Sequence, residues 1–390
     1  MRERNSSVRS LLLLCYIFFS LIGFVLGMRT SIFYYVQDAY LDSYSPIANM
    51  ILISGICMQV SLYLSGRFMK KIGYKKLLNI GMGAFTVPIL CMFLVDSFSD
   101  FMVIYTLLMF AYGIAVIILN LYVGVLEPRK KASNLMTLHL FFCLGALMGP
   151  KLISVLTDLT ISWQLVTCLT GIPLLLVFLV TLKANAPDVE LISRSGEFVD
   201  VSSRETYGYT SILIVVFMCS QVWEYGIGTW FVMFVSQSGR YTIGDAALYL
   251  TLFYLTYPVV RVVLAKIIGR FDLLKLTFIS FLYAAICGLI GALTGQLIFF
   301  SLTGIGVATI YPALMAYMQD ALGSDADRKI GFISMVGGLI QYVAIWSVGL
   351  ISDAYGIVLG FNSLVIYLFI GAVGVVLIRH LHSGLVVETV

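Results

Sequence analysis

Charged residues are scarce in this sequence. They make up only 11% of its 390 residues, whereas hydrophobic residues make up 60%. An ordinary soluble domain has roughly 25% charged residues, and no single water-soluble core could bury so much apolar surface. The formal net charge of +4 does not indicate nucleic-acid binding, because the basic residues form short runs between apolar stretches. The composition predicts a membrane protein that binds no nucleic acid.

Groups that hold metals, nucleotides or catalytic water are also missing. The three histidines, His139, His380 and His382, show no H-E-x-x-H spacing, and the seven cysteines form no C-x-x-C pair. There is no G-x-x-x-x-G-K-[ST] loop, and no polar stretch is long enough for an ATPase domain. We therefore expect no metal site, no bound cofactor and no enzymatic activity. A multi-pass membrane enzyme or sensor is the alternative of another class.

Apolar stretches of about twenty residues, the length that crosses a bilayer as a helix, recur along the whole chain. In hydrocarbon the backbone amides of such a stretch can be satisfied internally only by a helix. We predict an all-α membrane protein with twelve transmembrane helices, at Leu11–Val36, Pro46–Phe68, Leu77–Val95, Phe101–Leu126, Asn134–Thr157, Trp163–Leu182, Tyr209–Ser236, Ala246–Ile268, Leu274–Leu293, Leu297–Met318, Ile330–Ile351 and Ile357–Ile378.

A polar stretch, residues 183–208, separates the first six helices from the last six. It combines acidic residues with Ser and Gly, which predicts a cytoplasmic linker. The predicted domains are a six-helix bundle over residues 1–182, the linker, and a second six-helix bundle over residues 209–390. Weak similarity between the basic connections after the second and eighth helices supports a duplication. Two such bundles, related by an axis along the membrane normal, are typical of transporters that work by alternating access.

The basic residues predict the orientation. Apart from cations inside the spans, every Lys and Arg except Arg240 falls on one face of the membrane, together with both ends of the chain. The positive-inside rule makes this face cytoplasmic. We expect a multi-pass protein of the plasma membrane with both termini in the cytoplasm.

The connection after the second helix resembles the signature of the major facilitator superfamily, G-x-x-x-D-[RK]-x-G-[RK]-[RK]. It departs from that signature at Lys70, which stands in place of the acid, and at Tyr74, which stands in place of a cation. In the family this acid latches the cytoplasmic gate. The resemblance assigns to the gate the four residues that match, Gly66, Lys71, Gly73 and Lys75.

Further segments are similar to the fucose permease and sugar:proton symporter branch of this superfamily. They are Asn120, residues 134–135, 139–142 and 145–150, Glu224 with Trp230, residues 304–306, Tyr311 with Pro312, residues 337–338, Gly349 and Asp353. The resemblance implies the twelve-helix fold of that family, with the first, fourth, seventh and tenth helices lining the substrate cavity. The glycines among these residues also favour close helix packing.

Three charged residues lie well inside apolar spans: Arg29, Lys151 and Glu224. Each charge at mid-bilayer costs about 2.5 to 3.5 kcal/mol even on the lenient insertion scale, so these side chains should face a cavity or one another. We interpret Arg29, together with Lys151, as binding an anionic or hydroxyl-rich substrate, and Glu224 as carrying a coupling proton. The alternatives are a static ion pair between the bundles and, for Lys151, snorkelling to the outer interface.

Polar residues on the expected cavity helices complete the candidate site. His139 is a candidate proton relay or a structural hydrogen-bonding residue, and Arg261 is a candidate gate-pairing residue. Aromatic and amide side chains suit a sugar, because rings stack on its C–H faces while amides meet its hydroxyls. The candidates for substrate binding are Arg29, Tyr34, Asn120, Lys151, Gln221, Trp223, Glu224, Tyr311 and Gln341.

The function expected from these residues is secondary active transport of a small polar solute, driven by the proton gradient. Sugar symporters of the resembling branch are expected to carry an acid in the first helix, where this chain has Arg29. A sugar acid or related organic anion is therefore an alternative to a neutral sugar. A drug or metabolite exporter of the same fold is the nearest rival function. We expect a monomer whose partners are the solute and the lipid bilayer.

Overall fold

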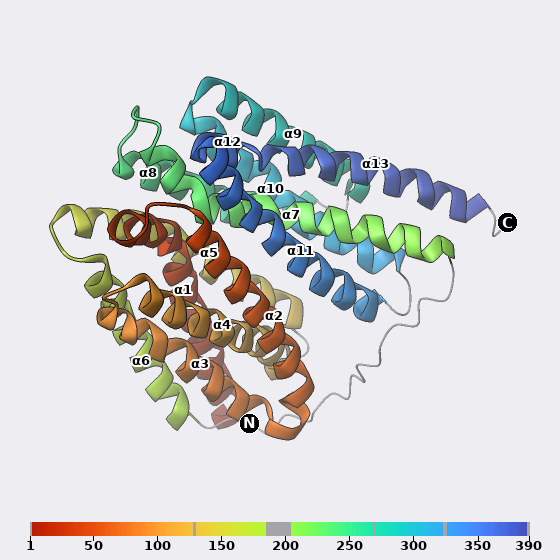
Figure 1. Cartoon of the computed structure of the whole chain (residues 1–390). Coiled ribbons are helices and arrows are strands. Elements are labelled where there is room, and N and C mark those ends of the chain that lie inside the picture. The colour runs from red at the N-terminus through yellow and green to blue at the C-terminus, as the bar shows by residue number, and fades with distance from the viewer. Residues whose placement is uncertain (1, 128–129, 185–203, 268–269, 323–325, 388–390) are drawn as a thin grey trace. The chain divides into compact units, whose positions relative to one another are not determined.

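The computed structural model describes residues 2–127, 130–184, 204–267, 270–322 and 326–387 (Figure 1). Among these residues the regular secondary structure consists of helices alone, and twelve helical spans are long and apolar enough to cross a membrane. The predicted all-α fold with twelve membrane-spanning helices is confirmed.

Two compact units, Met1–Ser195 and Gly196–Val390, divide the chain. The predicted linker, residues 183–208, lies largely outside the described residues, and its limits stay a prediction. The first unit, red to yellow-green in Figure 1, contains α1 (Arg2–Tyr40), α2 (Ser45–Ile72), α3 (Tyr74–Cys91), the short 3₁₀ helix η1 (Met92–Leu94), α4 (Phe98–Leu126), α5 (Lys131–Asp158) and α6 (Trp163–Lys183). The second unit, green to blue, contains α7 (Arg204–Ser236), α8 (Ile243–Ile267), α9 (Leu273–Thr294), α10 (Leu297–Ala321), α11 (Ala326–Tyr355), α12 (Ile357–Asn362) and α13 (Val365–Val387).

Short polar side chains begin several of these helices by satisfying backbone N–H groups that have no partner within the helix. At the start of α6 the Ser162 hydroxyl accepts a hydrogen bond from the Leu165 N–H at 3.3 Å. At the start of α8 the Thr242 N–H donates to the Asp245 carboxylate at 2.8 Å, while the Asp245 N–H donates to the Thr242 hydroxyl at 3.1 Å. This reciprocal pair, the arrangement of a capping box, marks where the chain re-enters the apolar region.

The last predicted helix is interrupted. The sequence predicts one continuous helix over Ile357–Ile378, whereas the chain forms α12 and α13, which together make the twelfth span. At the break the Ser363 hydroxyl donates to the Gly360 carbonyl at 2.7 Å, and the Leu364 N–H donates to the Phe361 carbonyl at 3.1 Å. A serine hydroxyl competes with the backbone N–H groups for such carbonyls. Both bonds reach back three residues, instead of the four residues of an α-helix, and α12 ends there.

The two units use the same helix pairings. In the first unit the most extensive contacts join α1 to α5, α2 to α4, α3 to α4, α3 to α6 and α1 to α6. In the second unit the corresponding helices meet: α7 with α11, α8 with α10, α9 with α10, α9 with α13 and α7 with α13. Each unit is therefore built to one plan, as expected for a duplicated six-helix bundle.

Glycines bring α1 and α5 into direct backbone contact. Gly23 and Gly27 on α1, and Gly145 and Gly149 on α5, each lie so close to a backbone carbonyl of the facing helix that an added Cβ would overlap it. Both pairs have the small-x-x-x-small spacing that lets membrane helices approach closely. Van der Waals contact between backbones therefore holds this pair, since lipid supplies no hydrophobic drive for helix association.

A second packing arrangement occurs at corresponding helices of the two units. On α2 the Ser61 hydroxyl donates to the carbonyl three residues earlier at 2.8 Å and touches Gly113 of α4. On α8 the Thr256 hydroxyl donates to the carbonyl three residues earlier at 2.6 Å and touches Gly304 of α10. The hydroxyl is satisfied within its own helix, so the facing helix needs only the small volume of a glycine.

We predict that Gly145→Ala lowers the stability of the protein, because its methyl group would overlap the Ser20 carbonyl of α1. Overpacking of this kind typically costs about 1 to 3 kcal/mol. The matched control is Gly331→Ala on α11, where an added Cβ meets open space, so that the better helix propensity of alanine should leave stability unchanged or slightly raised. Thermal unfolding of the two purified variants checks this, and equal stability would contradict the close contact.

Candidate functional site

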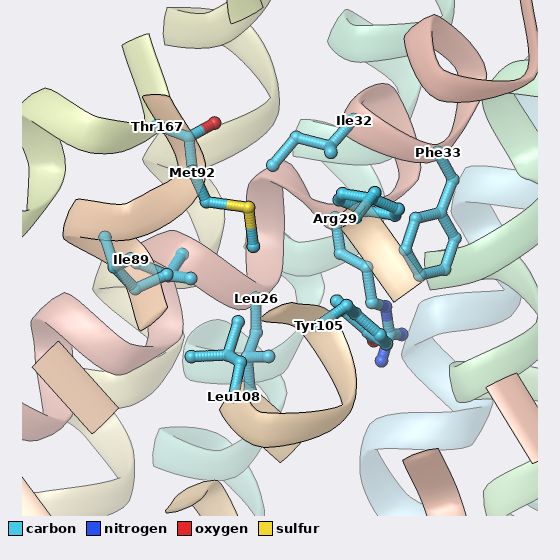
Figure 2. Close-up of a pocket in the computed structure, with 11 residues that line it drawn as sticks. Leu26, Arg29, Ile32, Phe33, Ile89, Met92, Tyr105, Leu108 and Thr167 are labelled. Carbon is cyan, nitrogen blue, oxygen red and sulfur yellow. The ribbon is translucent and has the colours of Figure 1, made fainter. Parts of the chain in front are cut away.

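Helix α1 carries Arg29 into the apolar interior of the first unit. Its side chain is only 9% exposed, and its guanidinium donates to the Tyr105 hydroxyl of α4. Figure 2 shows the guanidinium beside Tyr105, with Phe33 alongside. The Tyr105 ring is itself held by an edge-to-face contact with Phe33, with ring centroids 5.1 Å apart. A second helix thus positions the cation.

A small cavity lies next to Arg29, lined by residues of α1, α3, η1, α4 and α6. Its volume is about 10 Å³, which is about the least space that holds one water molecule. The lining is mostly apolar, and Thr167, one of its few polar members, donates its hydroxyl to the Trp163 carbonyl at 2.7 Å. The cavity is far too small for a sugar and is not the solute site.

Asn120 on α4 and His139 on α5, both predicted site residues, are brought together. The Asn120 amide N–H₂ donates to the Val116 carbonyl at 2.7 Å, so the amide oxygen faces His139. That oxygen lies 3.0 Å from His139 Nε2 and can only accept, so the imidazole donates from Nε2 and carries a proton there. The exposed His139 ring also packs edge-to-face on Phe19 of α1, with ring centroids 5.6 Å apart.

In the second unit, Glu224 on α7 belongs to a cluster with residues of α8 and α10. Its carboxylate interacts electrostatically with the hydroxyls of Tyr257 and Tyr311. Arg261 interacts with the same two hydroxyls, and its guanidinium carbon lies 5.3 Å from the centroid of the Tyr257 ring. An acid and a cation therefore share two tyrosines, and Arg261 also makes a cation–π contact. Of this cluster, Tyr311 is 38% exposed, whereas Tyr257 is 3% exposed.

Trp223, next to Glu224 in sequence, lies in the packed interior of the second unit. Its side chain has no exposed surface, and its indole N–H donates to the Thr303 hydroxyl of α10 at 2.8 Å. Its ring packs on Phe300 and Phe361, at centroid distances of 6.4 and 6.2 Å. These contacts support a packing role and give no support to the predicted contact with solute.

The contacts described for the other predicted substrate-binding residues include neither Arg29 nor Glu224. Tyr34 on α1 is half-buried and packs edge-to-face on Tyr35 at 5.4 Å. Gln221 donates to the neighbouring Ser220 hydroxyl at 3.3 Å, and Gln341 of α11 is 4% exposed. Their roles stay predictions.

Lys151 lies on an outward face of α5, beside the exposed Met148 and Leu152. Within the described parts of the chain no hydrogen bond or ion pair of Lys151 is found. This placement does not join Lys151 to the Arg29–Tyr105 pair, and its predicted role also stays a prediction.

The four residues assigned to the gate have distinct structural settings. Gly73 alone separates α2 from α3 and has φ +84°, a conformation that side chains other than that of glycine rarely adopt. The Lys75 ammonium donates to the Thr181 carbonyl at the end of α6 at 2.5 Å, where a cation is favoured by the helix dipole. Among the described residues, a Cβ added at Gly66 would meet the Ile117 side chain of α4 at an ordinary contact distance, and Lys71 is exposed.

Two residues of these clusters, Tyr105 and Tyr257, were not predicted from sequence. Tyrosine is frequent here, with 23 in the chain, so neither stands out. For Tyr257 a signal existed, because it lies four residues before Arg261 and residues at that spacing share one face of a helix. For Tyr105 no local signal distinguishes it from a packing residue.

Comparison with known proteins agrees with this architecture. The sequence profile of the Major Facilitator Superfamily matches residues 11–345. No curated protein sequence matches the chain significantly.

Solved transporter structures share the fold over nearly the whole chain. A D-xylose-proton symporter has a TM-score of 0.76 at 13% identity, covering 95% of this chain and 97% of its own. A bacterial homologue of the human lysosomal transporter Spinster has a TM-score of 0.74 at 12% identity, covering 97% of each chain. The E. coli fucose:proton symporter has a TM-score of 0.60 at 18% identity, covering 96% of this chain and 99% of its own. The resemblance to sugar symporters seen in the sequence is confirmed at the level of the fold.

We predict that Thr303→Val destabilises the second unit, because it leaves the buried indole N–H of Trp223 without its acceptor. An unsatisfied buried donor costs about 1 to 3 kcal/mol. Thr294→Val at the exposed end of α9 removes a hydroxyl that bonds to the Ile290 carbonyl of its own helix and to the Gln296 N–H; Gln296 is exposed, so water can replace that bond and stability should change little. Thermal unfolding in detergent measures the difference, and a Thr303→Val protein as stable as the control would refute the packing role.

Proposed function

Because this chain belongs to the Major Facilitator Superfamily, we propose that it is a secondary active carrier that moves a small polar solute by alternating access, together with protons. The family and the transporter structures of the same fold indicate a transporter. The solute class that suits the residues is a sugar, a sugar acid or a related organic anion.

The observation that carries this proposal is the buried guanidinium of Arg29. A charge in the middle of an apolar span costs about 2.5 to 3.5 kcal/mol. A residue that served packing alone would avoid this cost, whereas a ligand-binding residue offsets it through its ligand. Arg29 is held in place by Tyr105, which supports a positioned recognition group rather than a side chain directed to the membrane surface.

The chemistry around Arg29 favours an anionic or hydroxyl-rich solute. Guanidinium groups recognise carboxylates and paired hydroxyls through parallel N–H donors. Among the described residues that line the adjacent cavity, none is acidic. The fucose and D-xylose symporters share the fold, and a sugar acid would combine their hydroxyl pattern with the charge that Arg29 prefers.

Glu224 supports proton coupling. A carboxyl group that interacts with two tyrosine hydroxyls, which also interact with a guanidinium, can hold or release a proton within a membrane-spanning segment. His139, hydrogen-bonded to Asn120, is a second candidate for a proton relay. We further propose that the protein acts as a monomer in the plasma membrane, with both termini cytoplasmic and no cofactor beyond the proton gradient.

The substitution Arg29→Gln tests the proposed recognition group. Hydrogen bonds to a charged group contribute about 1.5 to 3 kcal/mol, so we expect uptake of the transported solute to fall by roughly 10- to 100-fold. Proteoliposomes offered labelled L-fucose, D-xylose and D-glucuronate provide the measurement. Arg240→Gln, in an exposed connection, is the matched control. Unchanged uptake by Arg29→Gln would remove Arg29 from the site.

The substitution Glu224→Gln tests proton coupling separately from solute binding. Glutamine keeps the size of the side chain but cannot exchange a proton. We expect uphill, proton-driven accumulation of the solute to be lost while exchange of labelled for unlabelled solute continues. Glu127→Gln, which alters an acid paired with Lys130 near the end of α4, should leave both activities intact. Accumulation at the normal rate by Glu224→Gln would assign the coupling proton to another residue, with His139 the next to test.

A further inference from the structure

The hydroxyl of Tyr257 is one of seven buried side-chain atoms that lack a hydrogen-bond partner within the described residues, and it is the one that interacts with the Glu224 carboxyl group. The side chain is 3% exposed, and within the described residues its hydroxyl has no partner with hydrogen-bond geometry. Leaving such a group unsatisfied costs about 1 to 3 kcal/mol, and buried hydroxyls are nearly always paired. A tyrosine retained in this position calls for an explanation that packing does not provide.

The partner within reach is the carboxyl group of Glu224. It interacts with the Tyr257 hydroxyl, although the two groups do not meet the geometry of a hydrogen bond in this structure. Glu224 is on α7 and Tyr257 on α8. A small rotation of either side chain, or a small shift of one helix along the other, would align them.

The ring of Tyr257 is fixed, so its hydroxyl has a defined position. Phe253, one turn earlier on α8, packs against the ring with centroids 5.4 Å apart, and Tyr254 lies at 6.3 Å. The guanidinium of Arg261 lies 5.3 Å from the ring centroid. With the ring held by three neighbours of its own helix, the hydroxyl end is the part available to α7.

Other helices bring few further titratable groups to Glu224. Helix α10 contributes Tyr311, which interacts with Glu224 and Arg261, and α11 contributes Tyr342, whose ring meets Tyr225 at 5.9 Å. Helices α12 and α13 approach α7 through apolar groups in the contacts that the structure describes, such as Phe361 against Trp223. Of the two tyrosines that interact with Glu224, Tyr257 is 3% exposed and Tyr311 is 38% exposed, so Tyr257 is the better shielded from water.

We propose that Tyr257 is the positioning residue for the proton of Glu224. A tyrosine hydroxyl both donates and accepts, so it donates to the ionised carboxylate and accepts from the protonated carboxyl. The proton itself is exchanged between Glu224 and water, and Tyr257 stays neutral throughout. The hydroxyl therefore stabilises each form of the acid in turn, and making or breaking this bond links the charge of Glu224 to the fit of α7 against α8.

This inference rests on the proposed role of Glu224, but a direct measurement on that carboxyl group tests it without any knowledge of the solute. In infrared difference spectra recorded between acid and alkaline pH, the protonated carboxyl of Glu224 gives a C=O stretching band that Glu224→Gln removes. Hydrogen bonding lowers the frequency of this band. We expect Tyr257→Phe to shift the band to higher wavenumber, and Tyr254→Phe, the same chemical change one turn earlier on α8, to leave it in place.

Two results would overturn the proposal: a band that Tyr257→Phe does not move, or the absence of any titrating band that depends on Glu224. If Tyr257→Phe does not yield folded protein, Glu224→Asp provides the same test, because its shorter side chain withdraws the carboxyl from Tyr257 and should shift the band in the same direction. A wild-type protein that shows no solute-driven proton movement would refute the proposed coupling while leaving the infrared result to decide the pairing.

Discussion

The hydrocarbon of a bilayer supplies no hydrogen-bond partners to a helix, and two helices that associate in it gain no free energy from the hydrophobic effect. Both units satisfy this constraint in the same manner. Hydroxyls such as those of Ser61 and Thr256 bond to carbonyls of their own helix, so these hydroxyls need no partner from the lipid. The facing helices then approach closely through glycine, as at the contacts of α1 with α5. Close van der Waals contact between backbones stabilises the helix pairs here, whereas in soluble proteins the burial of apolar surface from water does so.

The duplicated plan of the two units extends from helix pairing down to single residues. Corresponding pairs of helices pack in each unit, and the contact between a hydroxyl and a glycine occurs at matching helices, α2 with α4 and α8 with α10. The sequences around these contacts differ, with Ser in one unit and Thr in the other. Packing volume and local hydrogen bonding are therefore what the two units share, because these are the properties on which the helix contacts depend.

The charged clusters are exceptions to the apolar packing, and function is proposed for them on that ground. Each pairs a charged group with tyrosine: Arg29 with Tyr105 in the first unit, and Glu224 and Arg261 with Tyr257 in the second. Tyrosine suits this setting because its ring belongs to the apolar surroundings while its hydroxyl can meet either sign of charge. Such pairing lowers the cost of a charge without neutralising it, which leaves the charge able to act on a solute or a proton.

The sequence by itself determined the number of spans and marked Arg29 and Glu224, because apolar length and a charge within it are local properties that hold in any fold. It could not identify Tyr105 or Tyr257, and it gave no sign that the Trp223 side chain is fully buried. The acceptor of the Trp223 indole, Thr303, lies 80 residues away along the chain, and the carboxyl beside Tyr257 belongs to another helix. Only the tertiary structure decides which polar groups meet, because helical periodicity gives the face of a residue within its own helix but not the neighbour that this face will contact.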